Sequence, residues 1–205
     1  MKYIYPPRPE TKIAPESLNR FEEMGVYFAE VKLNGSSMEV YTNGNTECKT
    51  MNRHKEPIAC KISKEELLSL HKGNGDIVLC GELMNKGQKD ETGKVWNNVY
   101  VIWDIIVYNG EHLLGRTFEE RYELLKTLYP NNPVKKYLHQ ISDNCYRIEK
   151  IDSKFMEVFK DICKYDMYEG LVMKRKDGKL ENGTTATNNT RTQIKCRKPT
   201  KNYNF

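Results

Sequence analysis

The apolar residues of this chain come in short blocks, which predicts many strands and few helices. Strands are expected over residues 26–31, 37–41, 76–83, 99–108, 170–175 and 192–197. Helices are expected over residues 17–23, 63–72, 117–129 and 153–164, and two of them open on a capping box, Ser63 with Glu66 and Thr117 with Glu120. Because these elements follow no regular βαβ rhythm, the pattern predicts an α+β domain with antiparallel sheets flanked by helices.

Four connecting segments carry turn or loop signals. Asn34-Gly35, between two strand-like runs, predicts a tight hairpin. Residues 1–15 are rich in proline and predict an extended arm along the domain surface. Residues 84–98 are polar and longer than most connections, so they predict either a mobile, substrate-facing loop or the end of a long hairpin. Residues 181–190 form a polar, low-complexity stretch before the last strand.

The strand expected over residues 99–108 is apolar on both faces except at Asp104. An ionised carboxylate inside such a strand is costly unless a partner compensates its charge. The sequence therefore predicts a buried partner for Asp104 and leaves the identity of that partner open.

With 205 residues, 38% of them apolar, and no internal linker, the chain is predicted to form one domain over residues 1–205. It contains no apolar stretch long enough to cross a membrane, and its N-terminus lacks the apolar segment of a secretion signal. We therefore expect a soluble cytoplasmic protein with no membrane partner. The six cysteines form no CxxC pair, so free thiols are expected rather than disulfides or a zinc site.

The net charge of +5 is distributed unevenly. Residues 174–205 carry nine lysines and arginines against two acids, a balance of +7 that leaves −2 for residues 1–173. A basic terminus on a nearly neutral body is typical of a protein that contacts phosphates, but a solvated tail has the same composition. Charge alone leaves both interpretations open.

Several ionisable side chains stand where folding alone would not require them. They are Lys32 before the Asn-Gly turn, Arg53, Glu82 at a strand end, Glu169 before the strand that ends in Lys174, and Lys195 with Arg197 in the last strand. Taken singly, each also fits a solvated residue: a lysine beside a turn, an acid at a strand end, or a basic edge strand. Their combination and order are more specific than any one of them.

These segments resemble, in order, six motifs of the covalent nucleotidyltransferases, the superfamily of ATP-dependent DNA and RNA ligases and mRNA capping enzymes. The similar segments are Glu30-Val31-Lys32-Leu33-Asn34-Gly35, Asn52-Arg53, Cys80-Gly81-Glu82-Leu83, residues 101–106 with Trp103-Asp104, Glu169-Gly170-Leu171-Val172-Met173-Lys174, and Gln193-Ile194-Lys195-Cys196-Arg197. The resemblance extends over residues 27–199. It implies a ligase-type nucleotidyltransferase domain of ATP-grasp-like fold, with no oligonucleotide-binding domain expected because the chain ends shortly past the last motif.

The resemblance also implies a role for the residues of these motifs. Lys32 is the nucleophile, and Lys195 and Arg197 assist the reaction. The residues expected to contact ATP are Glu30, Lys32, Arg53, Glu82, Trp103, Lys174 and Lys195, with Trp103 stacked on the adenine. Glu169 is directed toward a Mg²⁺ or Mn²⁺ ion that keeps several waters and binds the phosphates.

The chemistry of these residue types agrees with those roles. A lysine amine that attacks the α-phosphate of ATP forms a lysyl-AMP phosphoramidate and releases pyrophosphate. Because the usual pKa of lysine is about 10.4, the site must favour the neutral amine through neighbouring cations. Lys174, Lys195, Arg197 and the metal are the expected sources, and the same charges stabilise the phosphate during the reaction.

Two departures from the motifs bear on the substrate. Asn34 stands where the nucleophile motif has an acid, and Ser37 stands where many DNA ligases have an arginine. RNA ligases also depart from that acid, so RNA joining is slightly favoured over DNA joining. We therefore predict a minimal ATP-dependent polynucleotide ligase that adenylylates Lys32, passes AMP to a 5′-phosphate and joins that end to a 3′-hydroxyl.

The expected partners of a monomer without a strand-binding domain are nucleic-acid ends and a separate strand-binding protein. An mRNA guanylyltransferase, which would use GTP through the same lysine, is the neighbouring enzyme alternative. A non-catalytic, basic nucleic-acid-binding module is the alternative from another class. The joint presence of Lys32, Glu82, Glu169 and Lys195 argues against that module, because binding alone needs no carboxylate beside the phosphates.

Overall fold

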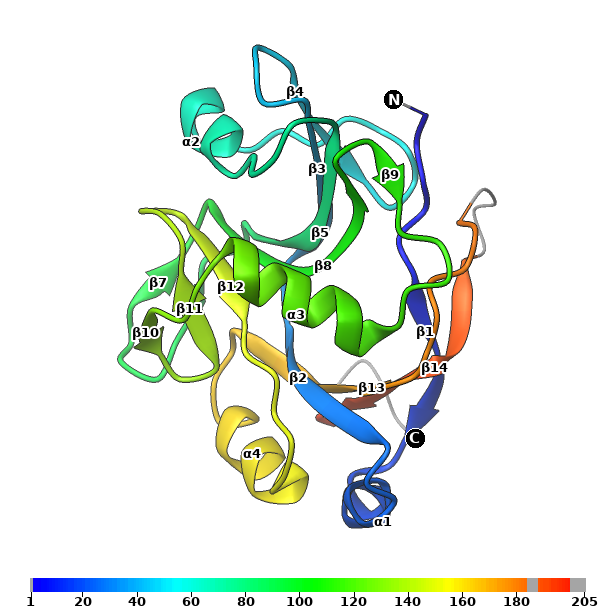
Figure 1. Cartoon of the computed structure of the whole chain (residues 1–205). Helices are drawn as coiled ribbons and strands as arrows, with labels where there is room; N and C mark the ends of the chain where they lie inside the picture. The colour runs from blue at the N-terminus through cyan, green and yellow to red at the C-terminus, as the bar shows by residue number, and fades with distance from the viewer. Residues whose placement is uncertain (1, 184–187, 200–205) are drawn as a thin grey trace.

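The computed structural model describes residues 2–183 and 188–199 and contains two mixed β-sheets (Figure 1). The smaller sheet has the strand order β1, β14, β13, β2, which span Arg8–Ile13, Asn189–Arg197, Tyr168–Arg175 and Tyr27–Leu33. The larger sheet has the order β10, β11, β12, β8, β5, β3, β4, which span Pro133–Lys135, Leu138–Gln140, Cys145–Ile148, Val99–Tyr108, Ile77–Met84, Ser36–Thr42 and Cys48–Asn52; β9 (Glu111–His112) pairs with β8. The α+β class is confirmed. The sheets are mixed rather than purely antiparallel, because β1 runs parallel to β14 and β12 to β8.

All four predicted helices are present. They are α1 (Leu18–Glu23, after the 3₁₀ turn η1 at Pro15–Ser17), α2 (Lys64–Ser69), α3 (Phe118–Leu128) and α4 (Phe155–Ile162). The helix α4 buries its apolar side chains at the spacing of successive helical turns, and α3 packs against β8 of the larger sheet. Figure 1 shows α3 crossing between the two sheets, with α1 and α4 at the end of the smaller one.

One of the two predicted capping boxes is complete and the other is half formed. Before α3, the Thr117 and Glu120 side chains each bond the backbone N–H of the other residue. Before α2, the Ser63 hydroxyl accepts from the N–H of Glu66, but the Glu66 carboxylate accepts from Ser142 and Asn144 instead of returning to Ser63. The second half of that motif is used to hold a distant loop.

The prediction of a hairpin at Asn34-Gly35 is wrong. The strand β2 pairs with β13 in the smaller sheet, whereas β3 pairs with β4 and β5 in the larger one. Asn34 and Gly35 therefore carry the chain from one sheet into the other. Glycine is required here because a Cβ at position 35 would lie 2.4 Å from the carbonyl oxygen of Leu83. A glycine needed for close approach and a glycine needed for a hairpin turn leave the same signal in the sequence.

Residues 84–98 contain a short hairpin, and Lys86 of the same segment lines the cavity described below. β6 (Gln88–Lys89) pairs antiparallel with β7 (Val95–Trp96). Trp96 is buried, and its indole Nε1 donates to Asp90 Oδ2 at 2.7 Å. Lys135 of β10 also pairs with Asp90, which begins the turn between β6 and β7, so the larger sheet holds the turn of this hairpin.

The proline-rich arm is extended, as predicted, and part of it forms the edge strand β1. Before β1, the Tyr3 hydroxyl donates to Glu39 Oε1 at 2.8 Å, and the Ile4 N–H donates to the Tyr41 hydroxyl at 3.1 Å. The arm therefore contacts β3 of the larger sheet and then pairs with β14 of the smaller one (Figure 1). It links the two sheets through β1, which lies at the opposite edge of the smaller sheet from β2.

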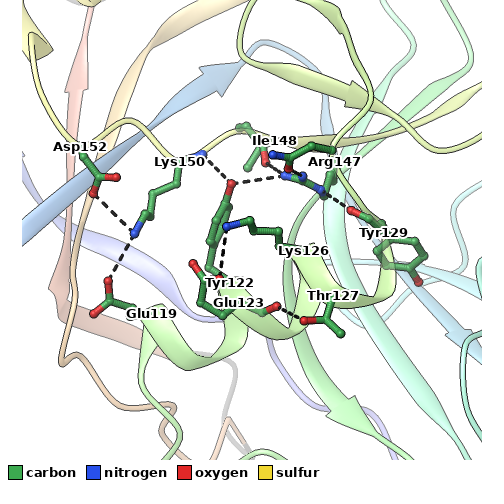
Figure 2. A network of polar contacts seen from close by, with 11 residues as sticks. Glu119, Tyr122, Glu123, Lys126, Thr127, Tyr129, Arg147, Ile148, Lys150 and Asp152 are labelled. Atoms are coloured by element: carbon green, nitrogen blue, oxygen red, sulfur yellow. Dashed lines mark hydrogen bonds and ion pairs between the residues drawn. The ribbon is translucent and has the colours of Figure 1, made fainter.

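A buried polar network holds the end of β12 against α3 (Figure 2). Arg147 is fully buried, and its guanidinium donates to the Tyr129 carbonyl at 2.7 Å and to the Tyr122 hydroxyl at 3.3 Å. The same hydroxyl accepts from the backbone N–H of Lys150 at 2.9 Å. These contacts fix the strand end that carries Ile148, a residue of the cavity wall described below.

Three further expectations concern the whole chain. All six cysteines are free thiols, as predicted. Among the described residues, no helix has the length and apolar character needed to cross a membrane. Residues 184–187 of the polar stretch at 181–190, and residues 200–205 of the basic terminus, lie outside the described residues.

Asp104 has the buried partner that its position demands. Arg121 of α3 donates from Nε and Nη2 to the two carboxylate oxygens of Asp104, at 2.8 Å each, and the side chains are 1% and 3% exposed. This bidentate pair attaches α3 to β8 at a point next to Trp103.

Replacing Asp104 by alanine should destabilise the fold strongly. Asp104→Ala leaves the Arg121 guanidinium buried without its counter-charge, which costs about 3–5 kcal/mol. Urea unfolding of the purified chain measures this loss. The control is Glu123→Ala on the exposed side of the same helix, where the ion pair with Lys126 contributes about 0–1 kcal/mol. Equal losses for the two variants would contradict the role of the buried pair.

Candidate active site

The smaller sheet forms one wall of the candidate site from three strands in fixed register. β13 pairs antiparallel with β2 and β14, so that Lys32 lies opposite Gly170 and Gly170 lies opposite Arg197. Side chains alternate between the two faces of a strand, so the row two residues away points to the same face. That second row consists of Glu30, Val172 and Lys195. The register therefore gathers residues from three distant parts of the sequence.

Glu169 reaches this face through an irregularity in β13. The register skips one residue between Tyr168 and Gly170, so Glu169 is the extra residue of a β-bulge. Bulges redirect a side chain that regular alternation would send to the other face. Glu169 Oε2 lies 2.5 Å from Lys32 Nζ and 3.3 Å from Arg197 Nε. The predicted nucleophile and the predicted metal-directed carboxylate are therefore in direct contact.

These rows line a cavity of about 810 Å³ between the two sheets. The larger sheet contributes Glu82 from β5 and Trp103 from β8, and the arm contributes Arg8 and Pro9. All nine residues singled out from the sequence line this cavity: Glu30, Lys32, Arg53, Glu82, Trp103, Glu169, Lys174, Lys195 and Arg197.

Glu82 stands across the cavity from the smaller sheet, beside the β2–β3 connection. Its Oε1 accepts from the Gly35 N–H at 3.1 Å. Burial raises the pKa of the Glu82 carboxyl to about 7, and the charge of Lys32 opposes that rise in part. Glu82 therefore links the larger sheet to the turn that follows the lysine.

Lys174 is buried away from Lys32 and is held by residues of both sheets. Its Nζ lies 2.6 Å from Glu30 Oε2, donates to the Trp103 carbonyl at 2.9 Å, and lies 5.2 Å from the centre of the Trp103 ring. Burial raises the pKa of Glu30 to about 7, with Lys174 acting in the opposite direction. Of the cations expected to act on Lys32, Lys174 is thus occupied elsewhere, and its contacts position Trp103.

Lys195 and Arg197 are the cations that lie at the Lys32 end of the wall. Arg197 shares the Glu169 carboxylate with Lys32. Lys195 Nζ donates to the Pro9 carbonyl at 3.3 Å. Burial lowers the pKa of Lys195, and the positive charges of Arg197 and Lys32 lower it further. Lys32, Lys195 and Arg197 thus place three cations near one carboxylate, Glu169, at this end of the wall, and cations there favour the binding of phosphate.

Arg53 stands at the open edge of the cavity. It follows β4 in an exposed turn, and its Nε contacts His54 Nε2 at 3.1 Å. The structure brings Arg53 to the cavity without holding it in the buried cluster.

The wall residues that were given no role from the sequence include Arg8, Lys86 and Gln193. Arg8 lies in the proline-rich arm, for which no site role is predicted, whereas Lys86 lies in the segment 84–98, for which a substrate-facing loop is one of the two interpretations. Lys86 Nζ donates to the Gly35 carbonyl at 2.9 Å, next to the predicted nucleophile. Gln193 could have been found by counting back two residues from Lys195, because alternate residues of a strand share a face.

The departure at Asn34 has a local structural reason. Its side-chain amide donates from Nδ2 to the Asp166 carbonyl at 3.2 Å, and its N–H donates to the Met167 carbonyl at 2.9 Å. An ionised aspartate cannot donate and would repel that carbonyl oxygen. The amide therefore fits the contact between the β2–β3 connection and the start of β13.

The sequence profile of the ATP-dependent DNA ligase domain matches residues 10–190. The chain belongs to this family. The match spans the strands that carry Lys32, Glu82, Trp103 and Glu169, and it confirms the resemblance to the covalent nucleotidyltransferases. No curated protein sequence matches the chain significantly.

Solved ligase structures share the fold. A mycobacterial DNA ligase D complexed with ATP is similar with a TM-score of 0.63 and 17% identity, covering 95% of this chain and 60% of its own. The ATP-dependent DNA ligase of bacteriophage T7 in complex with ATP has a TM-score of 0.57 and 14% identity, covering 93% and 68%. An archaeal ATP-dependent RNA ligase has a TM-score of 0.51 and 14% identity, covering 93% and 48%. The family member described here thus spans 60% of the length of the mycobacterial protein.

Replacing Glu82 by glutamine should reduce the loss of stability on raising the pH. In the folded state the pKa of this carboxyl is raised from 4.5 to about 7. The resulting contribution of Glu82 to the free energy of unfolding is therefore fully present below pH 4.5 and is lost as the pH rises toward 7. Glu82→Gln keeps an acceptor for Gly35 and has no charge to bury. Between about pH 5 and about pH 8 the variant should lose about 1–3 kcal/mol less stability than the wild type.

Urea unfolding at the two pH values measures this difference. Glu65→Gln, an exposed carboxyl on α2, is the matched control and should follow the wild type. A Glu82→Gln variant with the wild-type pH dependence would show that this carboxyl does not titrate as its burial requires.

Proposed function

We propose that this chain is an ATP-dependent polynucleotide ligase that forms a covalent lysyl-AMP intermediate at Lys32. The observation that carries the proposal is the contact of Lys32 Nζ with Glu169 Oε2 at 2.5 Å, with Arg197 on the same carboxylate. A solvated lysine beside a turn would project into water, whereas the Lys32 side chain is 19% exposed and faces the cavity. Membership of the ATP-dependent DNA ligase domain family supports the same reaction.

In the first step, Lys32 Nζ attacks the α-phosphorus of ATP. A phosphorus–nitrogen bond forms, the bond from the α-phosphorus to the oxygen of the β-phosphate breaks, and pyrophosphate leaves with that electron pair. The ammonium must first give up a proton, and Glu169 and Glu82 are the carboxylates beside it. Lys195 and Arg197 are placed to stabilise the negative charge that develops on the phosphate.

The donor set fits a metal ion held largely by the nucleotide. No group of three or more His, Cys, Asp or Glu side chains with metal-ligand geometry occurs among the described residues. Mg²⁺ commonly takes one or two carboxylates together with phosphate oxygens and waters, and Glu169 would supply such a carboxylate. Mg²⁺ or Mn²⁺ bound there would neutralise phosphate charge during pyrophosphate release.

The later steps transfer and then release AMP. An oxygen of a 5′-phosphate attacks the phosphorus of the lysyl-AMP, the phosphorus–nitrogen bond breaks, and the strand end carries the AMP. A 3′-hydroxyl oxygen then attacks that 5′-phosphate, AMP leaves, and the strands are joined. We propose that the chain acts as a monomer and that a separate strand-binding protein assists it, because one cavity and its rim offer little surface for a duplex.

Incubation with ATP and Mg²⁺ should add one AMP, about 329 Da, to the wild-type chain. Lys32→Ala should add none, because the nucleophile is gone. Intact-protein mass spectrometry measures the adduct, and Lys126→Ala on the exposed side of α3 is the lysine control that should keep it. An adduct that persists in Lys32→Ala would place the nucleophile elsewhere, and labelling by GTP instead of ATP would favour the guanylyltransferase alternative.

We propose that RNA joining is slightly favoured over DNA joining. The support for this preference is Ser37, which lines the cavity where many DNA ligases have an arginine. Asn34 does not add to it, because the bond of its side chain to the Asp166 carbonyl explains that residue without reference to the substrate. Nicked RNA should therefore be sealed somewhat faster than nicked DNA of the same sequence, measured by denaturing gels at fixed salt. Faster sealing of DNA would refute the preference and leave the ligase proposal intact.

A further inference from the structure

Gln193 carries a polar group that the reaction at Lys32 does not use. Its side chain is 2% exposed and lines the cavity, and its Nε2 has no hydrogen-bond partner among the residues that the structure describes. Buried donors in native proteins are nearly always paired, because an unpaired one loses its bonds to water without compensation. An unpaired donor on a cavity wall therefore points to a ligand atom.

Gln193 marks the end of the cavity that is remote from the predicted nucleophile. It lies opposite Lys174 in register, and Lys174 lies opposite Phe28 of β2. Phe28 precedes Lys32 by four residues, which is about 13 Å along a strand. A nucleotide whose α-phosphate contacts Lys32 would therefore extend another of its parts toward Gln193.

The Gln193 end suits a nucleobase better than a phosphate. The positive charge of Lys174 is compensated there by Glu30 at 2.6 Å, and a carboxylate repels phosphate oxygens. Trp103 lines the same end and offers a ring face on which a base can stack. Arg197, by contrast, lies in the register row of Lys32, and Lys195 lies in the next row, between Arg197 and Gln193.

Resting on the proposed use of ATP, we infer that Gln193 is a specificity-determining residue that contacts the adenine base. Its Nε2–H donates to N1 or N7, the two ring nitrogens that flank the 6-amino group. Both are acceptors in adenine, and a glutamine amide is a common partner for this part of the base. In guanine N1 carries a proton, so a contact at N1 would also disfavour GTP.

The inference is tested by replacing Gln193 with methionine, which keeps the length of the side chain and removes the donor. Calorimetry on the full chain gives the dissociation constants of ATP, 1-deaza-ATP and 7-deaza-ATP, which lack N1 and N7 respectively. The wild type should bind one of these analogues about tenfold more weakly than ATP, the effect of one hydrogen bond. Gln193→Met should bind ATP about tenfold more weakly and show no further loss with that analogue.

Gln88→Met is the matched control. Gln88 on β6 also has a buried side-chain atom without a partner in the described part of the chain, but it lies outside the cavity. This control should show the wild-type constants for all three nucleotides. Thermal unfolding checks that Gln193→Met is folded, and Gln193→Leu provides a second test if it is not.

The outcomes separate this inference from the proposed function. If Gln193→Met keeps the wild-type constant for ATP, or retains the same analogue penalty, the inference is overturned. If an AMP adduct forms at Lys32 but ATP binding does not depend on Gln193, the ligase proposal stands and the inference about Gln193 fails. If the dissociation constants of the three nucleotides follow the expected pattern but no adduct forms, the contact of Gln193 with adenine stands and the ligase proposal fails. A wild-type chain that binds no ATP would overturn both.

Discussion

The candidate site depends on one close approach, at Gly170, where β13 passes between β2 and β14. Gly170 has a φ of +144°, and a Cβ there would lie 2.0 Å from the Cys196 carbonyl oxygen. Any side chain would push β14 away from β13, and Lys32 and Arg197 are the residues opposite Gly170 on the two sides. The bulge at Glu169 adjoins this glycine, so the Glu-Gly pair sets both the strand spacing and the direction of the carboxylate.

A second constraint holds the larger sheet in place relative to this wall. Two neighbouring residues of β8 take part: the Trp103 carbonyl accepts from Lys174, and the Asp104 carboxylate pairs with Arg121 of α3. Buried ion pairs are weak sources of net stability, because desolvation offsets much of the attraction, but the loss of one partner is costly. The two buried pairs, Glu30–Lys174 and Asp104–Arg121, therefore fix the position of Trp103 more than they stabilise the fold.

Much of this arrangement could be predicted from the sequence, and the reasons for the rest are physical. Periodicity located the helices and the long strands, and the cost of a buried carboxylate indicated that Asp104 needs a partner. Strand pairing over long distances leaves no local signal, so the crossing at Asn34-Gly35 was mistaken for a hairpin. The bulge that turns Glu169 toward Lys32 depends on the register with β2, and the arm that brings Arg8 to the cavity depends on its pairing with β14.

The geometry also changes the meaning of the basic terminus. Its count of +7 includes Lys174, Lys195 and Arg197, which all line the cavity. Glu30 compensates Lys174, and Glu169 is shared by Arg197 and Lys32, so the wall is less positive than the sequence suggests. A phosphate that enters must compete with Glu169 for these two cations. Which anions bind then depends on how well a ligand replaces the Glu169 carboxylate at these two cations. That depends on where the three side chains lie, which the count of charges in the sequence does not give.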